Sequence, residues 1–260
     1  MLRPRIIPCL LVSNKGLVKT VKFGAPKYVG DPINAVRIFN EKEVDELIVL
    51  DIDATTTGSE PDFRMIQNLA AECRMPLCYG GGIKTVEQAK IIIGLGVEKV
   101  ALSAAMINKP ALVTKISNDI GSQSVVAVLD VKKRLFGDRY VVYTHNAKVN
   151  TGECPIEFSQ SLENLGVGEI VLNSIDNDGE MKGYDLNLAK KIREKVSVPM
   201  TVLGGAGSLK DIGNLINNFG VIGAAAGSLF VFKGAYRAVL INYPNIVERD
   251  SLILNNLRRI

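Results

Sequence analysis

An eightfold alternation of short β-branched runs with amphipathic stretches extends along the chain and is the feature that most constrains its fold. The apolar runs are not interrupted by polar residues, which is typical of parallel strands that helices cover on both faces. Eight strand–helix units predict one α/β domain, a closed (β/α)8 TIM barrel, with an open doubly wound sheet as the alternative. The expected strands are residues 6–11, 47–51, 76–79, 100–103, 124–130, 170–173, 200–203 and 222–225, and the expected helices are residues 31–44, 60–73, 85–95, 110–120, 155–165, 186–195, 209–219 and 234–241.

The two halves of the chain resemble each other. The run Gly80-Gly81-Gly82-Ile83 is similar to Gly204-Gly205-Ala206-Gly207, and each run follows an expected strand and precedes an expected helix. Residues 47–53 likewise resemble residues 170–176. This repetition predicts one domain made of two half-barrels, approximately residues 1–122 and 123–260, with equivalent sites on opposite sides of the barrel mouth.

Composition argues against several classes of function. The net charge is only +4, with 31 basic side chains scattered among 27 acidic ones, which argues against a nucleic-acid surface. The longest apolar stretch, residues 221–232, is too short to span a bilayer, and the N-terminal residues lack the apolar segment of a signal peptide. We therefore expect a cytoplasmic protein with no membrane contact, no metal site and no cofactor. Four dispersed cysteines without metal-binding spacing are expected as reduced thiols: Cys9, Cys73, Cys78 and Cys154.

The glycine runs indicate phosphate binding. A glycine-rich turn between a strand and a helix exposes backbone N–H groups beside the positive end of the helix. A third such segment, residues 225–228, ends the eighth strand, where this fold usually binds phosphate. Two such sites facing each other across a barrel predict an elongated ligand with a phosphate at each end. The candidate phosphate-binding residues are Gly80, Gly81, Gly82, Gly204, Gly205, Gly207, Gly227 and Ser228.

Nearly the whole chain resembles the cyclase subunit of imidazole glycerol phosphate synthase, an enzyme of histidine biosynthesis. The resemblance implies a glutaminase subunit that docks under the barrel, with ammonia travelling through the barrel to a substrate at the top. It rests on the following segments: Arg5-Ile6-Ile7-Pro8-Cys9, Val49-Leu50-Asp51-Ile52, Gly80-Gly81-Gly82-Ile83, Tyr143-Thr144-His145, Gly168-Glu169-Ile170, Asp176-Asn177-Asp178-Gly179, Gly183-Tyr184-Asp185-Leu186 and Gly204-Gly205-Ala206-Gly207.

The resemblance also implies a charged gate at the barrel floor, formed by Arg5, Glu46, Lys99 and Glu169. Each residue stands just before or at the start of an expected strand, where an inward side chain would close the N-terminal end. Two acids and two bases in a low-dielectric floor are costly unless they pair. The alternative is that these are four ordinary surface charges.

The top of the barrel departs from the family pattern. The resemblance implies two catalytic aspartates, at the ends of the first and fifth strands. Asp130 retains the second, but Leu11 stands where the first belongs. Because side chains alternate along a strand, Leu11 shares a face with Arg5 and Cys9 and should point into the mouth. A leucine cannot transfer protons, and losing a positioned acid–base group typically costs about 10²–10⁴-fold in rate.

Further positions at the mouth differ from the family. Ser103-Ala104 replaces an Asn-Thr pair that binds phosphate, Asn173 replaces a Thr, and Leu203 replaces a Ser. Ser103 is kept as a candidate phosphate-binding residue because of its place in the first half-barrel. These changes together predict a remodelled ligand site.

Other polar residues are candidates for the same site. Lys19, in the long loop of residues 13–30, matches a family lysine that closes over substrate, and the alternative is a solvated side chain. Asp51 and Asp176, at the ends of the second and sixth strands, are expected to face the ligand, while Asp53 and Asp178 hold loops. The only histidine, His145, is expected to be an ordinary loop residue.

Three functional hypotheses follow. An intact floor under an altered mouth favours a barrel that receives ammonia and passes it to the amidination of a phosphorylated or nucleotide-linked sugar. Relatives of the cyclase serve acetamidino-sugar synthesis for surface polysaccharides in this way, together with a glutaminase and a third amidotransferase subunit. The alternatives are a true cyclase (a lyase of histidine biosynthesis) that uses Asp130 and a substitute base, and a non-catalytic activator of the glutaminase.

Overall fold

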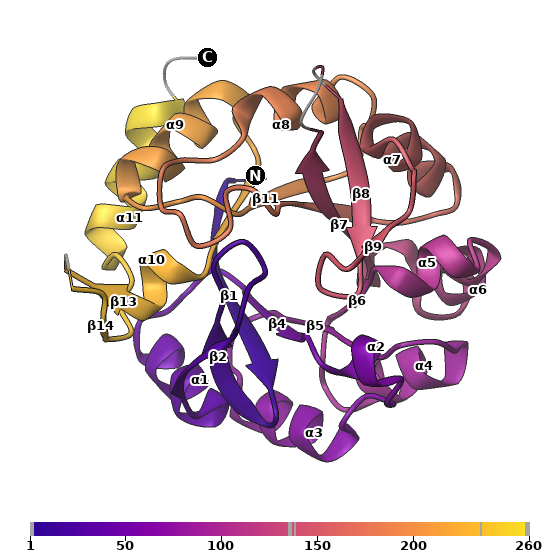
Figure 1. Ribbon diagram of the computed structural model, residues 1–260. Helices are drawn as coiled ribbons and strands as arrows, with labels where there is room; N and C mark the ends of the chain where they lie inside the picture. Colours follow the sequence, from indigo (N-terminus) through magenta and orange to yellow (C-terminus); the bar gives the residue numbers. More distant parts are fainter. Residues whose placement is uncertain (1–2, 135–136, 138, 235, 258–260) are drawn as a thin grey trace.

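Eight parallel strands pair edge to edge in a closed ring, and helices surround them on the outside (Figure 1). The computed structural model describes residues 3–134, 137, 139–234 and 236–257. The first barrel strand pairs with the eighth, and the fifth pairs with the sixth, so the ring is closed. The predicted closed barrel is confirmed, and the open sheet is wrong. The barrel strands are β1 (Arg5–Ser13), β4 (Leu47–Asp51), β5 (Leu77–Gly80), β6 (Lys99–Leu102), β7 (Val125–Lys133), β10 (Glu169–Ser174), β11 (Met200–Leu203) and β12 (Gly223–Ala226).

The outer helices begin where the sequence supplies polar caps. Asp31 and Asp62 accept backbone N–H bonds at two helix starts, and Thr85 and Ser208 form capping boxes at two others. Each helix turns an apolar face to the strands. The outer helices are α1 (Pro32–Glu41), α3 (Phe63–Glu72), α4 (Val86–Gly94), α6 (Ala111–Ile120), α7 (Pro155–Asn164), α8 (Leu186–Arg193), α9 (Leu209–Phe219) and α11 (Ile246–Leu257).

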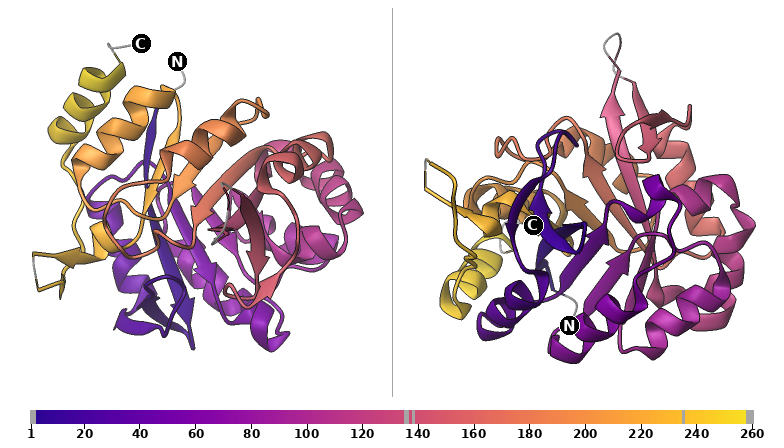
Figure 2. Two further views of the ribbon diagram at one scale, coloured as in Figure 1. Left: turned by 45° about the horizontal axis from the view of Figure 1, so that its top comes forward. Right: turned by 60° about the horizontal axis from the view of Figure 1, so that its bottom comes forward.

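The expected helix at residues 234–241 is wrong. The segment instead forms a small hairpin of β13 (Phe232–Lys233) and β14 (Ala238–Val239), which projects from the body (Figures 1 and 2). Gly234 has a φ of +74°, a left-handed turn conformation that ends any helix there, while residue 235 lies outside the described residues. The eighth outer helix is α11, further along the chain, and it packs against α9.

Hairpins extend two barrel strands on the mouth side. The expected long loop of residues 13–30 is instead the ordered pair β2 (Gly16–Lys19) and β3 (Lys27–Gly30), added antiparallel to the end of β1. A second hairpin pairs β7 with β8 (Tyr140–Thr144), and residues 135–136 and 138 between them lie outside the described part. A short strand, β9 (Val149–Asn150), pairs with β8. Both hairpins overhang the carboxyl ends of the barrel strands (Figure 2).

The predicted half-barrel boundary falls at the short 3₁₀ helix η1 (Ser122–Ser124), between β6 and β7. The duplication itself stays a prediction. All four cysteines are unpaired. Within the described ranges, no helix combines the length and the apolar character that a membrane crossing needs.

Candidate functional site

Four charged side chains close the amino-terminal end of the barrel, and we call Arg5, Glu46, Lys99 and Glu169 the floor ring. Arg5 binds Glu46 and also Glu169, whose Oε1 lies 2.7 Å from Nη2. The Nζ atom of Lys99 lies 2.7 Å from Glu46 Oε1 and 2.8 Å from Glu169 Oε2. Each base therefore bridges both acids, and the ring is complete. The interpretation as four separate surface charges is wrong.

Thr201, at the start of β11, belongs to the floor although the sequence analysis did not single it out. Its hydroxyl donates to Glu169 Oε1 at 2.6 Å, and its side chain is fully buried. Burial opposes ionisation of Glu169, but the charges of Arg5 and Lys99 outweigh it and lower the pKa to about 2. Strand alternation back from Leu203 was the signal that could have found this inward polar residue.

Above the floor ring, inward side chains from all eight barrel strands form an apolar column, which we call the bore. Burial raises the pKa of Cys9 to about 12 and that of Cys78 well above its usual value, so both thiols stay neutral. The smallest contributor is β12, whose sequence is Gly-Ala-Ala-Ala; a Cβ on Gly223 would lie 1.9 Å from the Thr201 hydroxyl. The buried bore residues are Ile7, Cys9, Ile48, Cys78, Ala101, Val126, Val128, Val171, Leu203 and Ala225.

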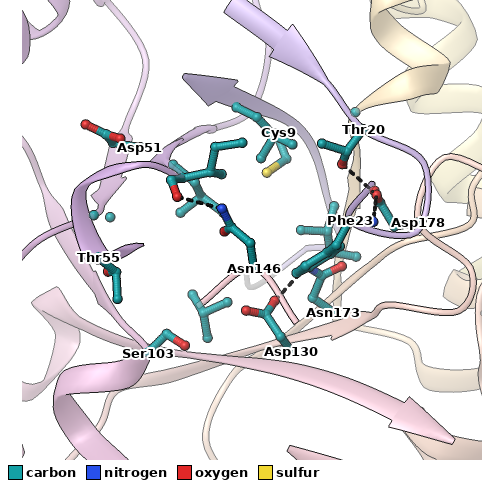
Figure 3. A pocket seen from close by; sticks show the side chains of 18 of the residues that line it. Cys9, Thr20, Phe23, Asp51, Thr55, Ser103, Asp130, Asn146, Asn173 and Asp178 are labelled. Atoms are coloured by element: carbon teal, nitrogen blue, oxygen red, sulfur yellow. Dashed lines mark hydrogen bonds between the residues drawn. The ribbon is translucent and has the colours of Figure 1, made fainter. Parts of the chain in front are cut away.

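The bore ends at a cavity of about 540 Å³ among the carboxyl ends of the strands, which we call the mouth pocket (Figure 3). Leu11 lines it, as strand alternation predicts, and Cys9, Val128 and Leu203 belong both to the pocket lining and to the bore. The pocket and the bore are therefore contiguous. TIM-barrel active sites lie at this face of the fold.

Asp130 is a partly buried acid of the pocket. Its Oδ1 accepts a 2.9 Å hydrogen bond from Asn173 Nδ2 (Figure 3). Burial raises the pKa of Asp130 to about 7, against the lowering effect of the Asn173 bond and with a smaller raising effect of Asp178. A carboxyl group with a pKa near neutrality can serve as a general acid or base. Leu11, at the position of the first family aspartate, supplies no partner for it.

The β2–β3 hairpin covers the pocket and is tied to the turn after β10 (Figure 3). The Thr20 hydroxyl donates to Asp178 Oδ2 at 2.8 Å, and the Phe23 N–H donates to the same oxygen at 3.3 Å. A Cβ on Gly179 would lie 2.5 Å from the Thr20 carbonyl, so this approach requires glycine. The hairpin is a lid that closes the mouth pocket on one side.

Lys19 is buried in the pocket beneath this lid. Its side chain is 6% exposed, so the alternative of a solvated lysine is wrong. Its Nζ lies close to Gly227, where a Cβ would come within 2.2 Å of it. Among the described residues no carboxylate pairs with this ammonium. A buried cation without a partner favours an anionic ligand at the end of β12.

The aspartates do not all lie where they were expected. Asp51 lines the pocket and accepts from the N–H groups of Asp53 and Ala54, but the carboxylate of Asp176 accepts from Lys133 N–H and lies outside the pocket lining. Asp178 lines the pocket in its place. The extension of β7 past the barrel rim brings the Lys133 N–H to Asp176, and this contact could not be predicted from the strand pattern.

Side chains cap α4 and α9, the helices that follow the two glycine turns, and phosphate at the starts of these helices stays a prediction. Gln88 caps α4 by accepting from Lys84 N–H at 2.7 Å, and Asp211 caps α9 by accepting from the N–H groups of Gly207 and Ser208. The N–H of Gly207 therefore bonds within its own helix start, and Gly207 lies outside the pocket lining. The other candidate phosphate-binding residues line the pocket: Gly80, Gly81, Gly82, Ser103, Gly204, Gly205, Gly227 and Ser228.

Two short helices offer the donors that the capped helices lack. Helix α5 (Ala104–Asn108) follows β6, and α10 (Ser228–Val231) follows β12; neither has a side-chain cap bond at its start. Ser103 and Gly227 stand at their N-caps and line the pocket. Helix α5 follows the strand after the glycine turn of residues 80–82, and α10 follows the strand after the glycine turn of residues 204–207. Each half of the chain therefore has one candidate anion site. Lys19 adds positive charge only to the second site.

A comparison of two glycines tests the first anion site. Gly82 and Gly58 have φ values of +72° and +75°, so replacing either with alanine introduces similar backbone strain of about 1–2 kcal/mol. A Cβ on Gly82 would lie 2.9 Å from the Ser59 carbonyl, whereas one on Gly58 meets nothing within 4 Å.

Inorganic phosphate should raise the melting temperature of the wild type and of Gly58→Ala, because a ligand at tenfold its Kd stabilises by about 1.4 kcal/mol per site. Gly82→Ala should lose the share of this rise that the first site provides. Differential scanning calorimetry with and without phosphate measures both effects. Equal rises in the two variants would remove this turn from the anion site.

A second turn reaches into the pocket from β8. His145, Asn146 and Ala147 all have φ between +54° and +60°, a strained run for residues other than glycine. The turn lets Asn146 Nδ2 donate to the Ile52 carbonyl at 2.8 Å, across the pocket (Figure 3). His145 bonds to Thr144 Oγ1 and lines the pocket. Asn146 belongs to no sequence motif, and its left-handed backbone is the feature that marks it as part of the site.

Known proteins are similar to this chain over the floor ring, the bore and the mouth pocket. A family model described as "Histidine biosynthesis protein" matches residues 5–237, a range that contains the floor ring, the bore and the mouth pocket. A Vibrio vulnificus protein named "Putative imidazole glycerol phosphate synthase subunit hisF3" is 59% identical over 253 residues, 97% of each chain. A Leptospira interrogans protein with a similar name is 56% identical over 252 residues, 97% of this chain and 99% of its own. The "Imidazole glycerol phosphate synthase subunit HisF" of Clostridium botulinum strain Okra is 38% identical over 233 residues, 90% of this chain and 92% of its own.

Proposed function

Because this chain belongs to the histidine biosynthesis protein family, and within it to the cyclase subunits of imidazole glycerol phosphate synthase, we propose that it is the ammonia-using subunit of a glutaminase-dependent synthase. The observation that carries this proposal is the complete floor ring directly beneath an apolar bore that ends in the mouth pocket. A buried ion network is rarely better for stability than apolar packing, so its retention supports a role in passage. Neutral ammonia can cross such a bore, whereas an ion would lose its hydration.

The proposed partner is a glutaminase subunit on the amino-terminal face, where the exposed Glu98 flanks the floor ring. A stable complex there should bury about 1,600 Å² or more. The test is a pull-down with a glutaminase of such a synthase, followed by glutaminase assays with and without the barrel. We expect a complex and a faster glutaminase. Absence of a complex at micromolar concentrations, with an unchanged rate, would overturn the proposal.

The floor ring can be tested within that complex. Lys99→Ala should leave the complex intact but release ammonia to solvent, because the ring loses the base that bridges Glu46 and Glu169. Lys90→Ala is the matched control, since Lys90 pairs with Asp119 on the outer surface. Free ammonia is measured while glutamine is hydrolysed. Equal release from both variants would separate the ring from ammonia passage.

For the chemistry in the pocket, the names of the relatives favour imidazole glycerol phosphate synthesis, a lyase reaction. On this candidate Asp130 transfers protons, and the two anion sites hold a ligand with a phosphate at each end. The phosphorylated ligand is supported by Lys19, which places an unpaired cation beside Gly227.

A second candidate is favoured by Leu11, which removes the acid–base group opposite Asp130. On it, the barrel delivers ammonia for the amidination of a phosphorylated or nucleotide-linked sugar, with a third amidotransferase subunit at the mouth. No relative named above carries a sugar in its name, so this candidate rests on the chemistry of the pocket. A non-catalytic activator would need the same floor and no ligand in the pocket, so phosphate binding in the calorimetric test would count against it. The unpaired cysteines fit the reducing cytoplasm as the site of action.

A further inference from the structure

One side-chain atom in the mouth pocket is buried without a partner. Asn173 is 5% exposed and lines the pocket, and its Nδ2 donates to Asp130. Its amide oxygen, Oδ1, has no hydrogen-bond partner among the residues that the structure describes. Leaving a buried acceptor unpaired is costly, so this oxygen fits a ligand that donates a hydrogen bond.

The position of Asn173 on β10 indicates what kind of ligand reaches its amide oxygen. Glu169, Val171 and Asn173 alternate along β10 and therefore share one face of the strand. Glu169 belongs to the floor ring and Val171 to the bore. At roughly 3.3 Å per residue, Asn173 stands about 13 Å above the floor ring on the same strand. Its amide thus lies where the bore opens into the pocket, next to Asp130 on β7 and Leu203 on β11.

The bore offers little hydrogen bonding before that point. The described side chains between the floor ring and Asn173 are apolar, apart from the neutral thiols of Cys9 and Cys78, which are weak donors and acceptors. A small polar molecule that rises through the bore therefore meets its first strong acceptors at the level of Asn173 Oδ1 and of Asp130, its register neighbour on β7. Of these two side chains, only Asn173 has an acceptor atom that is buried without a partner. The apolar side chain of Leu203 on the neighbouring strand offers no competing bond.

We propose that the amide oxygen of Asn173 binds neutral ammonia as it leaves the bore. This inference rests on the proposed function, because it assumes that ammonia enters through the floor ring. Oδ1 accepts an N–H of ammonia and leaves the nitrogen lone pair free to attack an acceptor in the pocket. A side-chain amide cannot give up a proton, so it holds ammonia without converting it to ammonium.

The test is a titration of the isolated full chain with ammonium chloride, followed by ¹H–¹⁵N NMR at one pH above the pKa values of both ammonium and trimethylammonium and at one pH below both. At the higher pH we expect saturable shifts of the Asn173 side-chain amide and of the backbone N–H groups of Leu172 and Ser174. Trimethylamine, which has no N–H at that pH, should not produce them, and neither should sodium chloride.

Variants sharpen the test. Asn173→Leu should weaken ammonia binding about tenfold or more, because it removes the acceptor. Asn173→Thr keeps a hydroxyl acceptor and should bind within a few-fold of the wild type. Asn218→Leu, the same change on the exposed face of α9, should bind as the wild type does. If Asn173→Leu does not fold, Asn173→Ala is measured against the same expectation.

Unchanged binding in Asn173→Leu, or equal shifts with trimethylamine, would overturn the inference. Because the titration uses the barrel alone, its failure is distinct from that of the proposed function. A barrel that binds and activates a glutaminase but shows no ammonia site at Asn173 refutes the site alone. A barrel that binds ammonia but neither binds nor activates a glutaminase keeps the site and loses the proposed function.

Discussion

Leu11→Asp should raise the rate of imidazole glycerol phosphate formation from ammonium salts by about 10²-fold, the lower end of what a positioned acid–base group contributes. The new carboxylate would face the mouth pocket with Asp130, whose pKa of about 7 already suits proton transfer. The gain should stop there, because Leu203 and Asn173 still differ from the family pattern. The wild-type chain should therefore be a slow cyclase even when ammonium is saturating.

The matched control is Leu50→Asp. Leu50 lies beside Leu11 in the register of β1 and β4, lines the same pocket and is also partly buried. A carboxylate there should give no comparable gain, because it is not at the family position. Product formation is followed for the wild type and both variants. Growth of a cyclase-deficient histidine auxotroph on the wild-type gene would contradict the prediction. It would also remove the argument for amidination of a sugar as the function of the barrel.

Breaking one member of the floor ring should be the most destabilising single change considered for this protein. Glu169→Gln should lower the free energy of unfolding by about 3–5 kcal/mol, because Arg5 and Lys99 then lose a shared, buried counter-charge. The fourfold variant Arg5→Met, Glu46→Leu, Lys99→Met and Glu169→Leu should be about as stable as the wild type, or more so. Glu157→Gln, an exposed change on α7, should stay within about 0.5 kcal/mol.

Acid should erase the Glu169→Gln difference. The folded-state pKa of Glu169 is about 2, below its ordinary value of 4.5, so its stabilisation is fully present above about pH 4.5. It declines as the pH falls toward 2, when the folded protein must also take up the proton. Denaturant unfolding at pH 7 and at successively lower pH measures this loss. A difference between wild type and Glu169→Gln that does not shrink in acid would contradict the assigned pairing.

Features that depend on a short repeating pattern could be predicted from the sequence. Alternation of strand and helix gives the barrel, and alternation of side chains places Leu11 at the mouth and Arg5 at the floor. These predictions succeed because a barrel strand has only two faces, so one residue of known direction fixes the others.

Contacts between particular polar groups of different segments could not be predicted from the sequence. The N–H of Gly207 pairs with Asp211, Asp176 is used by Lys133, and Thr20 finds Asp178 across the mouth. Each contact involves a backbone group or hydroxyl whose direction the hydrophobic pattern does not record. The hairpin in place of the eighth helix has the same origin, since Gly234 permits a turn that residues 234–241 otherwise do not suggest.

The small side chains of β12 affect how tightly the centre of the barrel is packed. Most protein cores are stabilised by the close packing of large apolar side chains. One of the eight barrel strands here, β12, consists of glycine and alanine. Gly223 cannot be replaced by a larger residue without a clash with the hydroxyl of Thr201. This side of the barrel axis therefore has less apolar packing than large side chains would give. On the proposed function, a substitution that fills the centre to raise the melting temperature, for example Ala225→Val, should slow the passage of ammonia. Selection for stability alone should then favour barrels whose bore is obstructed.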